Sequence, residues 1–174
     1  FLFDGQSSYF FLNFCKNIEK TLIKSECFCL SLLSNSKLTY YNFTMKNVLI
    51  IGSTGQIGSE LTMKLRSIYN GNIVAGYIPG AEPKGELAES GPSAIVDITN
   101  EQQIAETVSK YHIDTIYNLA ALLSAVAEAK PQLAWKIGMG GLFNVLEVAR
   151  TMKCAVFTPS SIGSFGASTP HTKT

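Results

Sequence analysis

The chain has 174 residues, of which 46% are hydrophobic and 16% charged, and its formal net charge is +1. This composition predicts one soluble globular domain, and a net charge near zero excludes the strongly basic surface that is typical of nucleic-acid binding, so we expect neither nucleic acid nor a membrane as a partner. The four cysteines are too scattered for a disulfide framework or a zinc site, and no metal is expected.

The first segment, residues 1–44, differs in composition from the rest of the chain. It holds seven of the ten phenylalanines but no Val, Ala or Pro, and the first methionine follows at Met45. We interpret residues 1–44 as a leader of uncertain origin outside the fold, either upstream read-through or an unrelated extension. A targeting segment is the alternative, but the segment lacks arginine and its apolar runs are shorter than a membrane span. The expected compartment is the cytoplasm or the mitochondrial matrix, and secretion is not expected.

A predicted strand at residues 47–51 runs directly into Gly52-x-x-Gly55-x-x-Gly58, and a helix is predicted over residues 56–70. In a dinucleotide-binding turn the first glycine permits the tight turn, the second lets backbone N–H groups approach a pyrophosphate, and the third lets the helix pack on its strand. The pyrophosphate then lies at the helix N-terminus. An ordinary strand, turn and helix is the alternative. The predicted cofactor loop comprises Gly52, Ser53, Thr54, Gly55, Gln56, Ile57 and Gly58.

Strands and helices alternate beyond this turn. Strands are predicted over residues 72–77, 94–98, 115–119 and 155–158, with a Gly/Pro-rich connection at 79–92. One helix begins at Asn100, which forms a capping-box pattern with Gln103, and another begins at Pro131. The apolar residues expected to be buried are Ile57, Leu61, Leu65 and Ile68 in the first helix and Ala134, Ile137, Leu142, Val145, Leu146 and Ala149 in the last. This alternation predicts an α/β fold with a doubly wound parallel sheet of the Rossmann type, incomplete at the C-terminus.

Three predicted strands end on the same edge of the sheet as the glycine loop. Their final segments are Asp97-Ile98, Leu119-Ala120-Ala121 and Ser160-Ser161. Because ligands of parallel sheets bind beyond the carboxyl ends of the strands, a cofactor lying along this edge would meet the three segments in order.

The strand-end segments belong to a longer set of motifs. The set also includes Tyr117-Asn118-Leu119, Leu122-Leu123-Ser124, Pro131-Gln132-Leu133-Ala134-Trp135, Asn144-Val145-Leu146-Glu147 and Ile162-x-x-Phe165-Gly166. With these motifs the chain resembles the amino-terminal part of the extended short-chain dehydrogenases in the NAD-dependent epimerase/dehydratase family. It is most similar to the epimerase-like L-threonine 3-dehydrogenases. The resemblance covers Met45 to about Pro170, so it implies that residues 45–174 are the N-terminal portion of an NAD-binding domain.

The resemblance implies a role for each of these segments. The glycine loop would hold the pyrophosphate of NAD, and Asp97-Ile98 would bind the adenine through a carboxylate and a backbone amide. The backbone of Leu119, Ala120 and Ala121 would run beside the nicotinamide ribose. Ser124 would contact the amino-acid substrate, and Ser161 would hydrogen-bond the reacting hydroxyl.

Each of these residues also has a purely structural interpretation. Asp97 could be only a helix-entry carboxylate, and Ser160 and Ser161 could be ordinary turn hydroxyls. For Ser124, a contact with the substrate and a purely structural role are equally supported by the sequence. Residues that we interpret as core or surface rather than site are Trp135, Leu122 and Leu123 (core), Cys154 (a small buried hydrophobe), and His112, His171 and Asp114 (surface or loop).

Three departures from the family pattern weigh against activity. Tyr77 stands where the family has an acidic residue, and a tyrosine cannot accept two hydrogen bonds from the ribose diol, so NAD affinity should fall. The family's asparagines in the helix after Trp135 are replaced by Gly138 and Gly140, and each glycine in a helix costs about 1 kcal/mol relative to alanine. The Tyr-x-x-x-Lys pair that supplies the catalytic base does not occur in these 174 residues.

The sequence therefore predicts the NAD-binding part of an L-threonine 3-dehydrogenase, which converts L-threonine to 2-amino-3-oxobutanoate in threonine catabolism. As given, the chain is expected to be inactive, because oxidation of an alcohol needs a base for the hydroxyl proton. Whether it acts as an enzyme is left open. A fragment of a nucleotide-sugar epimerase or dehydratase and a non-catalytic dinucleotide-binding module are the alternatives. L-threonine as substrate, and a homodimer, are expected of a full-length form.

Overall fold

The computed structural model describes residues 47–122 and 124–159. The chain divides into two units, residues 1–45 and 46–174, and the description concerns the second. The expected leader at residues 1–44, and Ser160, Ser161 and His171, lie outside the described residues.

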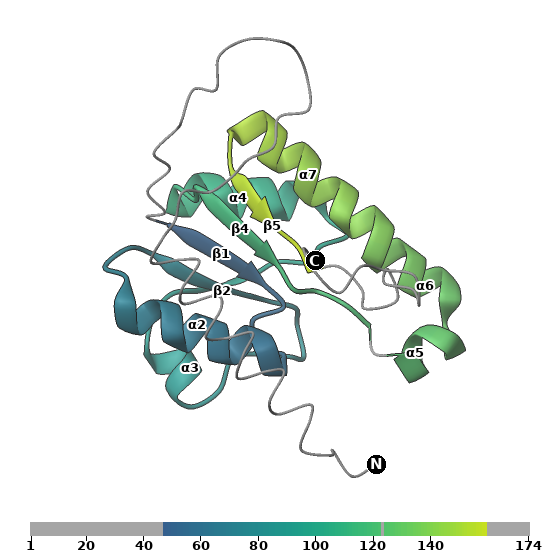
Figure 1. Cartoon of the computed structure of the whole chain (residues 1–174), viewed down its shortest axis with the longest axis horizontal. Coiled ribbons are helices and arrows are strands. Elements are labelled where there is room, and N and C mark those ends of the chain that lie inside the picture. The colour runs from purple at the N-terminus through teal and green to yellow at the C-terminus, as the bar shows by residue number, and fades with distance from the viewer. Residues whose placement is uncertain (1–46, 123, 160–174) are drawn as a thin grey trace, which may run out of the picture. The chain divides into compact units, whose positions relative to one another are not determined.

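Five parallel strands form one sheet in the described part of the chain, in the order β3-β2-β1-β4-β5 (Figure 1). Their bounds are β1 Val48–Ile51, β2 Ile73–Tyr77, β3 Ser93–Ile95, β4 Thr115–Asn118 and β5 Ala155–Phe157. The chain moves outward from β1 to β3 and then returns to the other side of β1, where β4 pairs with it from Val48 opposite Thr115 to Ile51 opposite Asn118. This reversal confirms the predicted doubly wound sheet and creates a switch point between β1 and β4.

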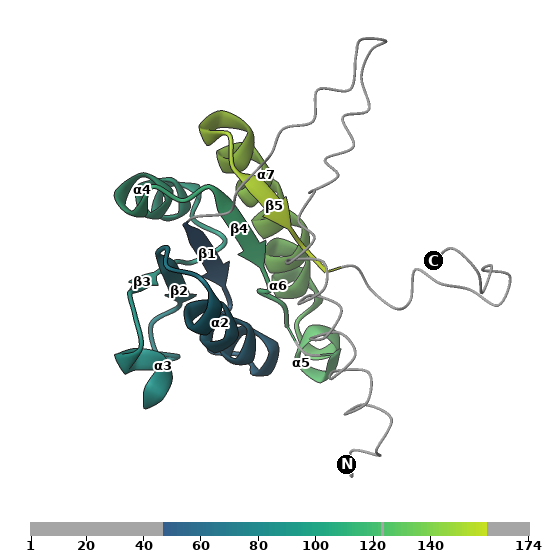
Figure 2. The ribbon, with the colours of Figure 1, turned by 60° about the vertical axis from the view of Figure 1, so that its left-hand side comes forward.

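Helices cover both faces of the sheet (Figures 1 and 2). Helix α2 (Gln56–Ile68) and the short α3 (Glu86–Glu89) lie on one face, and α4 (Glu101–Tyr111) and α7 (Gly141–Met152) lie on the other. Helix α5 (Ser124–Ala129), α6 (Pro131–Trp135) and the π-helical segment η1 (Lys136–Gly140) connect β4 to α7. Among the described residues, no helix is long and apolar enough to cross a membrane.

The central strand is buried on both faces because its side chains alternate between two helix layers. Every residue of β1 is 1% exposed or less, which accounts for the continuous apolar run in its sequence. On the side of α4 and α7, the core is formed by Leu49, Ile51, Val74, Val96, Ile98, Ile104, Val108, Ile113, Ile116, Val145, Val148 and Ala149. This core fixes β1 and β4 side by side, and with them the loops that follow the two strands.

Polar contacts fasten the amino-terminal edge of the sheet. Asp114 lies in the loop before β4, as predicted, and its carboxylate accepts hydrogen bonds from the backbone N–H of Asn47 (3.0 Å) and from the hydroxyl of Thr115 (2.7 Å). Cys154 is half-buried and its Sγ lies 3.2 Å from the carbonyl oxygen of Ile113. Burial, and then the charge of Asp114, raise the pKa of the Cys154 thiol.

Two of the predicted segments differ from the structure. Strand β3 ends at Ile95, three residues before the predicted end, because this edge strand pairs only with β2 and the pairing stops opposite Tyr77. The connection at residues 79–92 contains α3, whose apolar Leu87 is buried. A four-residue helix with one buried apolar position leaves too weak a periodic pattern to be found from the sequence.

The exposed faces of the helices also differ from the prediction. Trp135 is 70% exposed and Leu146 is 48% exposed, whereas both were expected in the core; Val148 takes the buried position instead. The predicted buried face of α2 is confirmed for Leu61 and Leu65, but both of its end residues, Ile57 and Ile68, are exposed.

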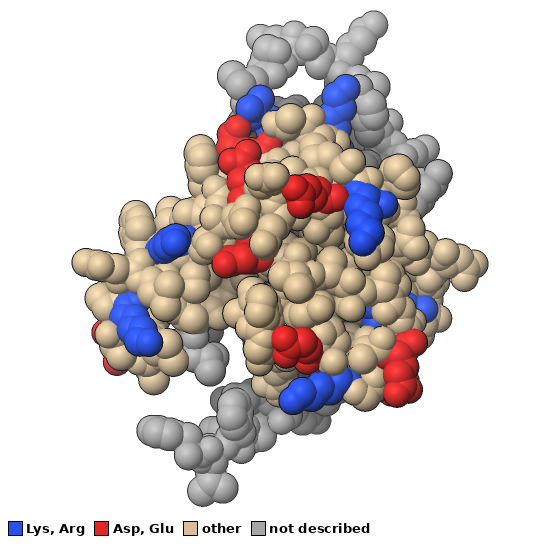
Figure 3. Space-filling view, turned by 180° about the vertical axis from the view of Figure 1, so that it is seen from behind, with Lys and Arg blue, Asp and Glu red and all other residues tan. Residues whose placement is uncertain are grey.

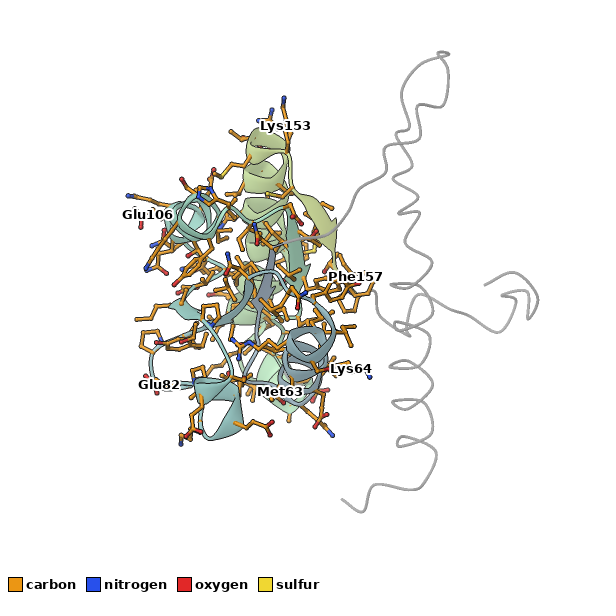
Figure 4. The ribbon with its side chains drawn as sticks, turned by 90° about the vertical axis from the view of Figure 1, so that its left-hand side faces the viewer. Met63, Lys64, Glu82, Glu106, Lys153 and Phe157 are labelled. Carbon is orange, nitrogen blue, oxygen red and sulfur yellow. The ribbon has the colours of Figure 1, made fainter. Side chains whose placement is uncertain are left out.

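Arg66 ties α2 to the connection between β2 and β3. Its guanidinium donates to the carbonyl oxygens of Ile73 (3.1 Å), Leu87 (2.7 Å) and Pro92 (2.6 Å) and to the hydroxyl of Ser90 (2.8 Å). The same hydroxyl also contacts the sulfur of Met63, which lies between α2 and α3 in Figure 4. Burial lowers the pKa of the Arg66 guanidinium. The arginine thus holds the connection between β2 and β3, including the end of α3, against α2.

We expect Arg66→Met to lower the free energy of unfolding by about 2–4 kcal/mol, because four acceptors lose a charged donor at once. The measurement is urea unfolding followed by circular dichroism. Arg150→Met is the matched control: Arg150 is 72% exposed and, among the described residues, bonds only Glu147 on its own helix, so the unfolding midpoint should hardly change. Equal midpoints for the two variants would contradict the role of Arg66.

Candidate functional site

The glycine loop begins with a residue that only glycine suits. Gly52 has a φ of +84°, and a Cβ there would lie 3.0 Å from backbone atoms of Leu119 and Ala120. Its N–H donates to the carbonyl oxygen of Gly76 (3.2 Å) at the end of β2. The first glycine therefore brings the loop after β1 against the loop after β4, at the switch point of the sheet.

Ser53 fixes the loop to the neighbouring strand. Its side chain is fully buried, and its hydroxyl (2.9 Å) and backbone N–H (3.1 Å) both donate to the carbonyl oxygen of Gly76. The hydroxyl is therefore occupied within the protein. Ser53 can serve a ligand only by holding the backbone of the loop in place.

Gly58 lets α2 pack directly on this loop. A Cβ at Gly58 would lie 2.2 Å from the carbonyl oxygen of Gly52 and 2.8 Å from the Cα of Ser53, so no larger residue fits. The Thr62 hydroxyl, also buried, donates to the Gly58 carbonyl oxygen (2.7 Å). The third glycine thus has the close-packing role that the sequence predicted.

Gly55 is different, because the space beside it is open. A Cβ there would meet only the carbonyl oxygen of Gly52, at an ordinary 3.4 Å, although the residue is the N-cap of α2. No side chain among the described residues caps the helix, and its first turn has no acidic residue. The first N–H groups of a helix have no partner within it, so they remain available to an anion at its positive end. Half-buried Thr54 and exposed Gln56 and Ile57 flank this opening.

The segment after β4 forms the other side of the site. Leu119 donates its N–H to the carbonyl oxygen of Ile51 (2.9 Å), and Ala120 donates to the side-chain oxygen of Asn118 (3.3 Å). Asn118 is buried, and its amide nitrogen lies 3.4 Å from the Thr158 hydroxyl, beyond β5. Asn118 was not predicted as a site residue, yet its side chain orients the predicted ribose segment of Leu119, Ala120 and Ala121. An asparagine at the end of an apolar strand is the sequence signal that could have identified it.

Asp97 and Ile98 lie beyond β3 and not within it. Asp97 Oδ1 accepts hydrogen bonds from the N–H (2.8 Å) and hydroxyl (2.9 Å) of Thr99, so the helix-entry interpretation of this carboxylate describes a real contact. The Asn100 side chain caps α4 by accepting from Gln103 N–H (3.2 Å). The predicted capping box is nevertheless only half present, because the Gln103 side chain accepts from the N–H of Asp97 instead of Asn100.

Tyr77 is the last residue of β2 and is half-buried. The turn that follows contains a carboxylate: Glu82 Oε1 accepts the N–H of Gly80 (2.8 Å), and this backbone hydrogen bond holds the pKa of Glu82 below its usual range. Glu82 is thus engaged with its own turn. The residue at the end of β2, where the family pattern has an acidic side chain, is the tyrosine.

The remaining predicted residues are only partly described. Ser124 begins α5, but its side chain is not described, and Ser161 lies outside the described residues. Gly138 and Gly140 lie in η1, where an added Cβ would meet nothing within 4 Å, whereas a Cβ at Gly141 would lie 2.8 Å from the side chain of Ile98. Packing against Ile98 therefore explains the glycine at position 141, whereas no contact requires a glycine at Gly138 or Gly140.

Charges are mixed on one face of the described unit, and possible metal ligands do not cluster among its described residues. On the face shown in Figure 3, Lys and Arg side chains of the described residues alternate with Asp and Glu and form no large area of one sign. Among the described residues, no group of three or more His, Cys, Asp or Glu could hold a metal ion. The described chemistry of the site is that of backbone N–H groups around Gly55.

The model of the NAD dependent epimerase/dehydratase family matches residues 48–174 of this chain. The chain belongs to this family. The predicted resemblance is thereby confirmed, and NAD is the cofactor of the family, as the sequence predicted. The three glycines, with the opening at Gly55, fit the pyrophosphate of such a cofactor.

The family includes close relatives of this chain. An uncharacterized epimerase/dehydratase of Staphylococcus saprophyticus is 48% identical over 131 residues, 75% of this chain and 41% of that protein. The solved L-threonine dehydrogenase of Clostridium difficile is 47% identical (TM-score 0.63) over 72% of this chain and 40% of its own. An L-threonine dehydrogenase of Cupriavidus necator, in its holo form, is 38% identical (TM-score 0.61) over 71% and 40%. The chain spans about two fifths of these relatives' length.

Proposed function

We propose that this chain is the NAD-binding part of an L-threonine 3-dehydrogenase. The observation that carries the proposal is the opening at Gly55, at the uncapped N-terminus of α2 and between two glycines that pack tightly. The choice of L-threonine as substrate rests on the 47% identity to the L-threonine dehydrogenase of Clostridium difficile. When bound, NAD would supply the acceptor for the hydride that leaves the substrate carbon.

The residues of the chain would have separate tasks in this function. Backbone N–H groups of Thr54, Gln56 and Ile57 would bind the pyrophosphate, and Asp97 with Ile98 would bind the adenine. The backbone of residues 119–121 would line the nicotinamide ribose. Ser124 would contact the amino acid, and Ser161 would hydrogen-bond its hydroxyl group. The product would be 2-amino-3-oxobutanoate.

Tyr77 provides a test of the cofactor orientation. We expect Tyr77→Asp to tighten NAD binding about 10- to 100-fold, because a carboxylate accepts both hydrogen bonds of the adenosine ribose, at about 1.5–3 kcal/mol for charged hydrogen bonds. Tyr77→Asn introduces a side chain with the shape of aspartate but without its charge, so it should tighten NAD binding less. Calorimetric titration measures both affinities. If the two variants bind NAD equally, the ribose does not lie beside residue 77.

The substrate assignment is tested in a complete enzyme. Residues 48–159 of this chain replace the matching residues of the Clostridium difficile L-threonine dehydrogenase, and NADH absorbance is followed with L-threonine. We expect turnover by the chimera and none by the same chimera carrying Gly55→Val. A folded chimera that binds NAD but leaves L-threonine unchanged would contradict the assignment.

A further inference from the structure

Two helices hold the dipeptide Asp97-Ile98 by its backbone. From the first turn of α4, Gln103 Oε1 accepts the N–H of Asp97 (3.0 Å). From α7, Asn144 Nδ2 donates to the carbonyl oxygen of Ile98 (3.0 Å). Because α4 and α7 pack together on one face of the sheet, these two amides fix the dipeptide from both ends.

The other polar groups of the dipeptide are nearly all used within the protein. Asp97 Oδ1 accepts two hydrogen bonds from Thr99, and the Asp97 carbonyl oxygen accepts the N–H of Asn100 (2.9 Å). In the described part of the chain, the groups without a partner are Asp97 Oδ2 and the N–H of Ile98. One acceptor and one donor, on adjacent residues, are therefore left for a ligand.

Packing also holds the side chain of Ile98 in place. It is 4% exposed and packs against Gly141, where a Cβ would lie 2.8 Å from both Cγ atoms of Ile98. Gly141 and Asn144 are one turn apart on α7, so the helix holds the isoleucine by its side chain and its carbonyl group together. The direction of the Ile98 N–H is thereby fixed.

We propose that Gln103 and Asn144 are positioning residues that hold this acceptor and donor at the spacing of adenine in the dinucleotide. Adenine presents an amino donor beside the ring acceptor N1, which complements a carboxylate oxygen beside an N–H. Hypoxanthine presents the reverse pattern, a carbonyl acceptor beside a protonated N1. The proposal rests on the proposed NAD site and adds two residues that do not touch the cofactor themselves.

The experiment compares the dissociation constants of NAD and of nicotinamide hypoxanthine dinucleotide for the full chain. We expect the wild type to prefer NAD about tenfold or more, since both hydrogen bonds are lost with hypoxanthine. Gln103→Met and Asn144→Leu keep the side-chain shape, and each should lower this preference about three- to tenfold. Gln103→Ala and Asn144→Ala are also made, in case Gln103→Met or Asn144→Leu does not fold. One folded variant at each position is sufficient for the comparison.

Gln102→Met is the matched control. Gln102 neighbours Gln103 but bonds Glu106 (2.8 Å), which points outward from α4 in Figure 4, so the preference should stay within about twofold of wild type. The ratio of the two dissociation constants is the decisive readout, because a variant that only destabilises the fold weakens the binding of both dinucleotides equally. An unchanged ratio in the Gln103 and Asn144 variants would overturn the proposal while NAD binding stands. Failure of the wild type to bind either dinucleotide would overturn the proposed function with it.

Discussion

Gly55→Val is expected to reduce NAD binding at least about 100-fold while the chain stays folded. The valine side chain would occupy the opening where a pyrophosphate approaches the N–H groups of α2. The protein itself has room for it, since a Cβ would meet only the carbonyl oxygen of Gly52 at 3.4 Å. The backbone at Gly55 is extended (φ −74°, ψ 168°), which valine adopts readily.

Calorimetric titration of NAD, with thermal melting of each protein, separates binding from folding in this experiment. Ser67→Val is the control, because it adds a valine near the other end of the same helix, at an exposed position. The control should bind NAD as the wild type does. Equal heats for wild type and Gly55→Val would remove the glycine loop from the cofactor site.

Gly58→Ala is expected to act on folding instead, lowering the free energy of unfolding by about 3 kcal/mol. The new Cβ would lie 2.2 Å from the Gly52 carbonyl oxygen, a backbone atom that cannot rotate away. The loop cannot shift easily either, because the N–H groups of Gly52 and Ser53 and the Ser53 hydroxyl are all bonded to Gly76.

Urea unfolding of Gly58→Ala beside Gly55→Ala measures this difference. Gly55→Ala adds the same methyl group to the same loop at an ordinary contact distance, so its midpoint should stay close to that of the wild type. Similar midpoints for the two variants would show that α2 does not pack on the loop as described. The two glycines thus separate the ligand role from the packing role within one motif.

The sheet and the glycine loop could be predicted because they leave a clear pattern within one short stretch of the sequence. The residues of β1 are buried on both faces, so the strand had to be a continuous apolar run, and Gly52 and Gly58 are required by backbone contacts that no other residue permits. The end of β3 could not be predicted in the same way. Val96 remains apolar and buried beyond the end of β3, and its N–H still donates to the carbonyl oxygen of Tyr77 (2.8 Å), so its sequence pattern is that of a strand residue.

The face of a helix that is covered depends on its neighbours and not on its own pattern. Trp135, Met139, Phe143 and Leu146 follow one another at helical spacing like a buried stripe, yet all four are exposed. The π-helical segment η1 lies within this run. Likewise, nothing local to Gln103 or Asn144 reveals that their amides reach Asp97 and Ile98, since those contacts depend on tertiary packing. Ser124 and Ser161 remain predictions.

We propose that the turn around Gly55 binds the pyrophosphate of NAD. A titration of NAD into the isotopically labelled chain, followed through the backbone amide resonances, tests this residue by residue. We predict the largest changes at Thr54, Gln56 and Ile57, where N–H groups would donate to the phosphates, with a separate change at Ile98 from the adenine. The Gly55 N–H already donates to the carbonyl oxygen of Gly52 (3.2 Å). Resonances unchanged at residues 54–57 in the presence of saturating NAD, or changes confined to other parts of the sheet, would show that NAD does not bind at this turn.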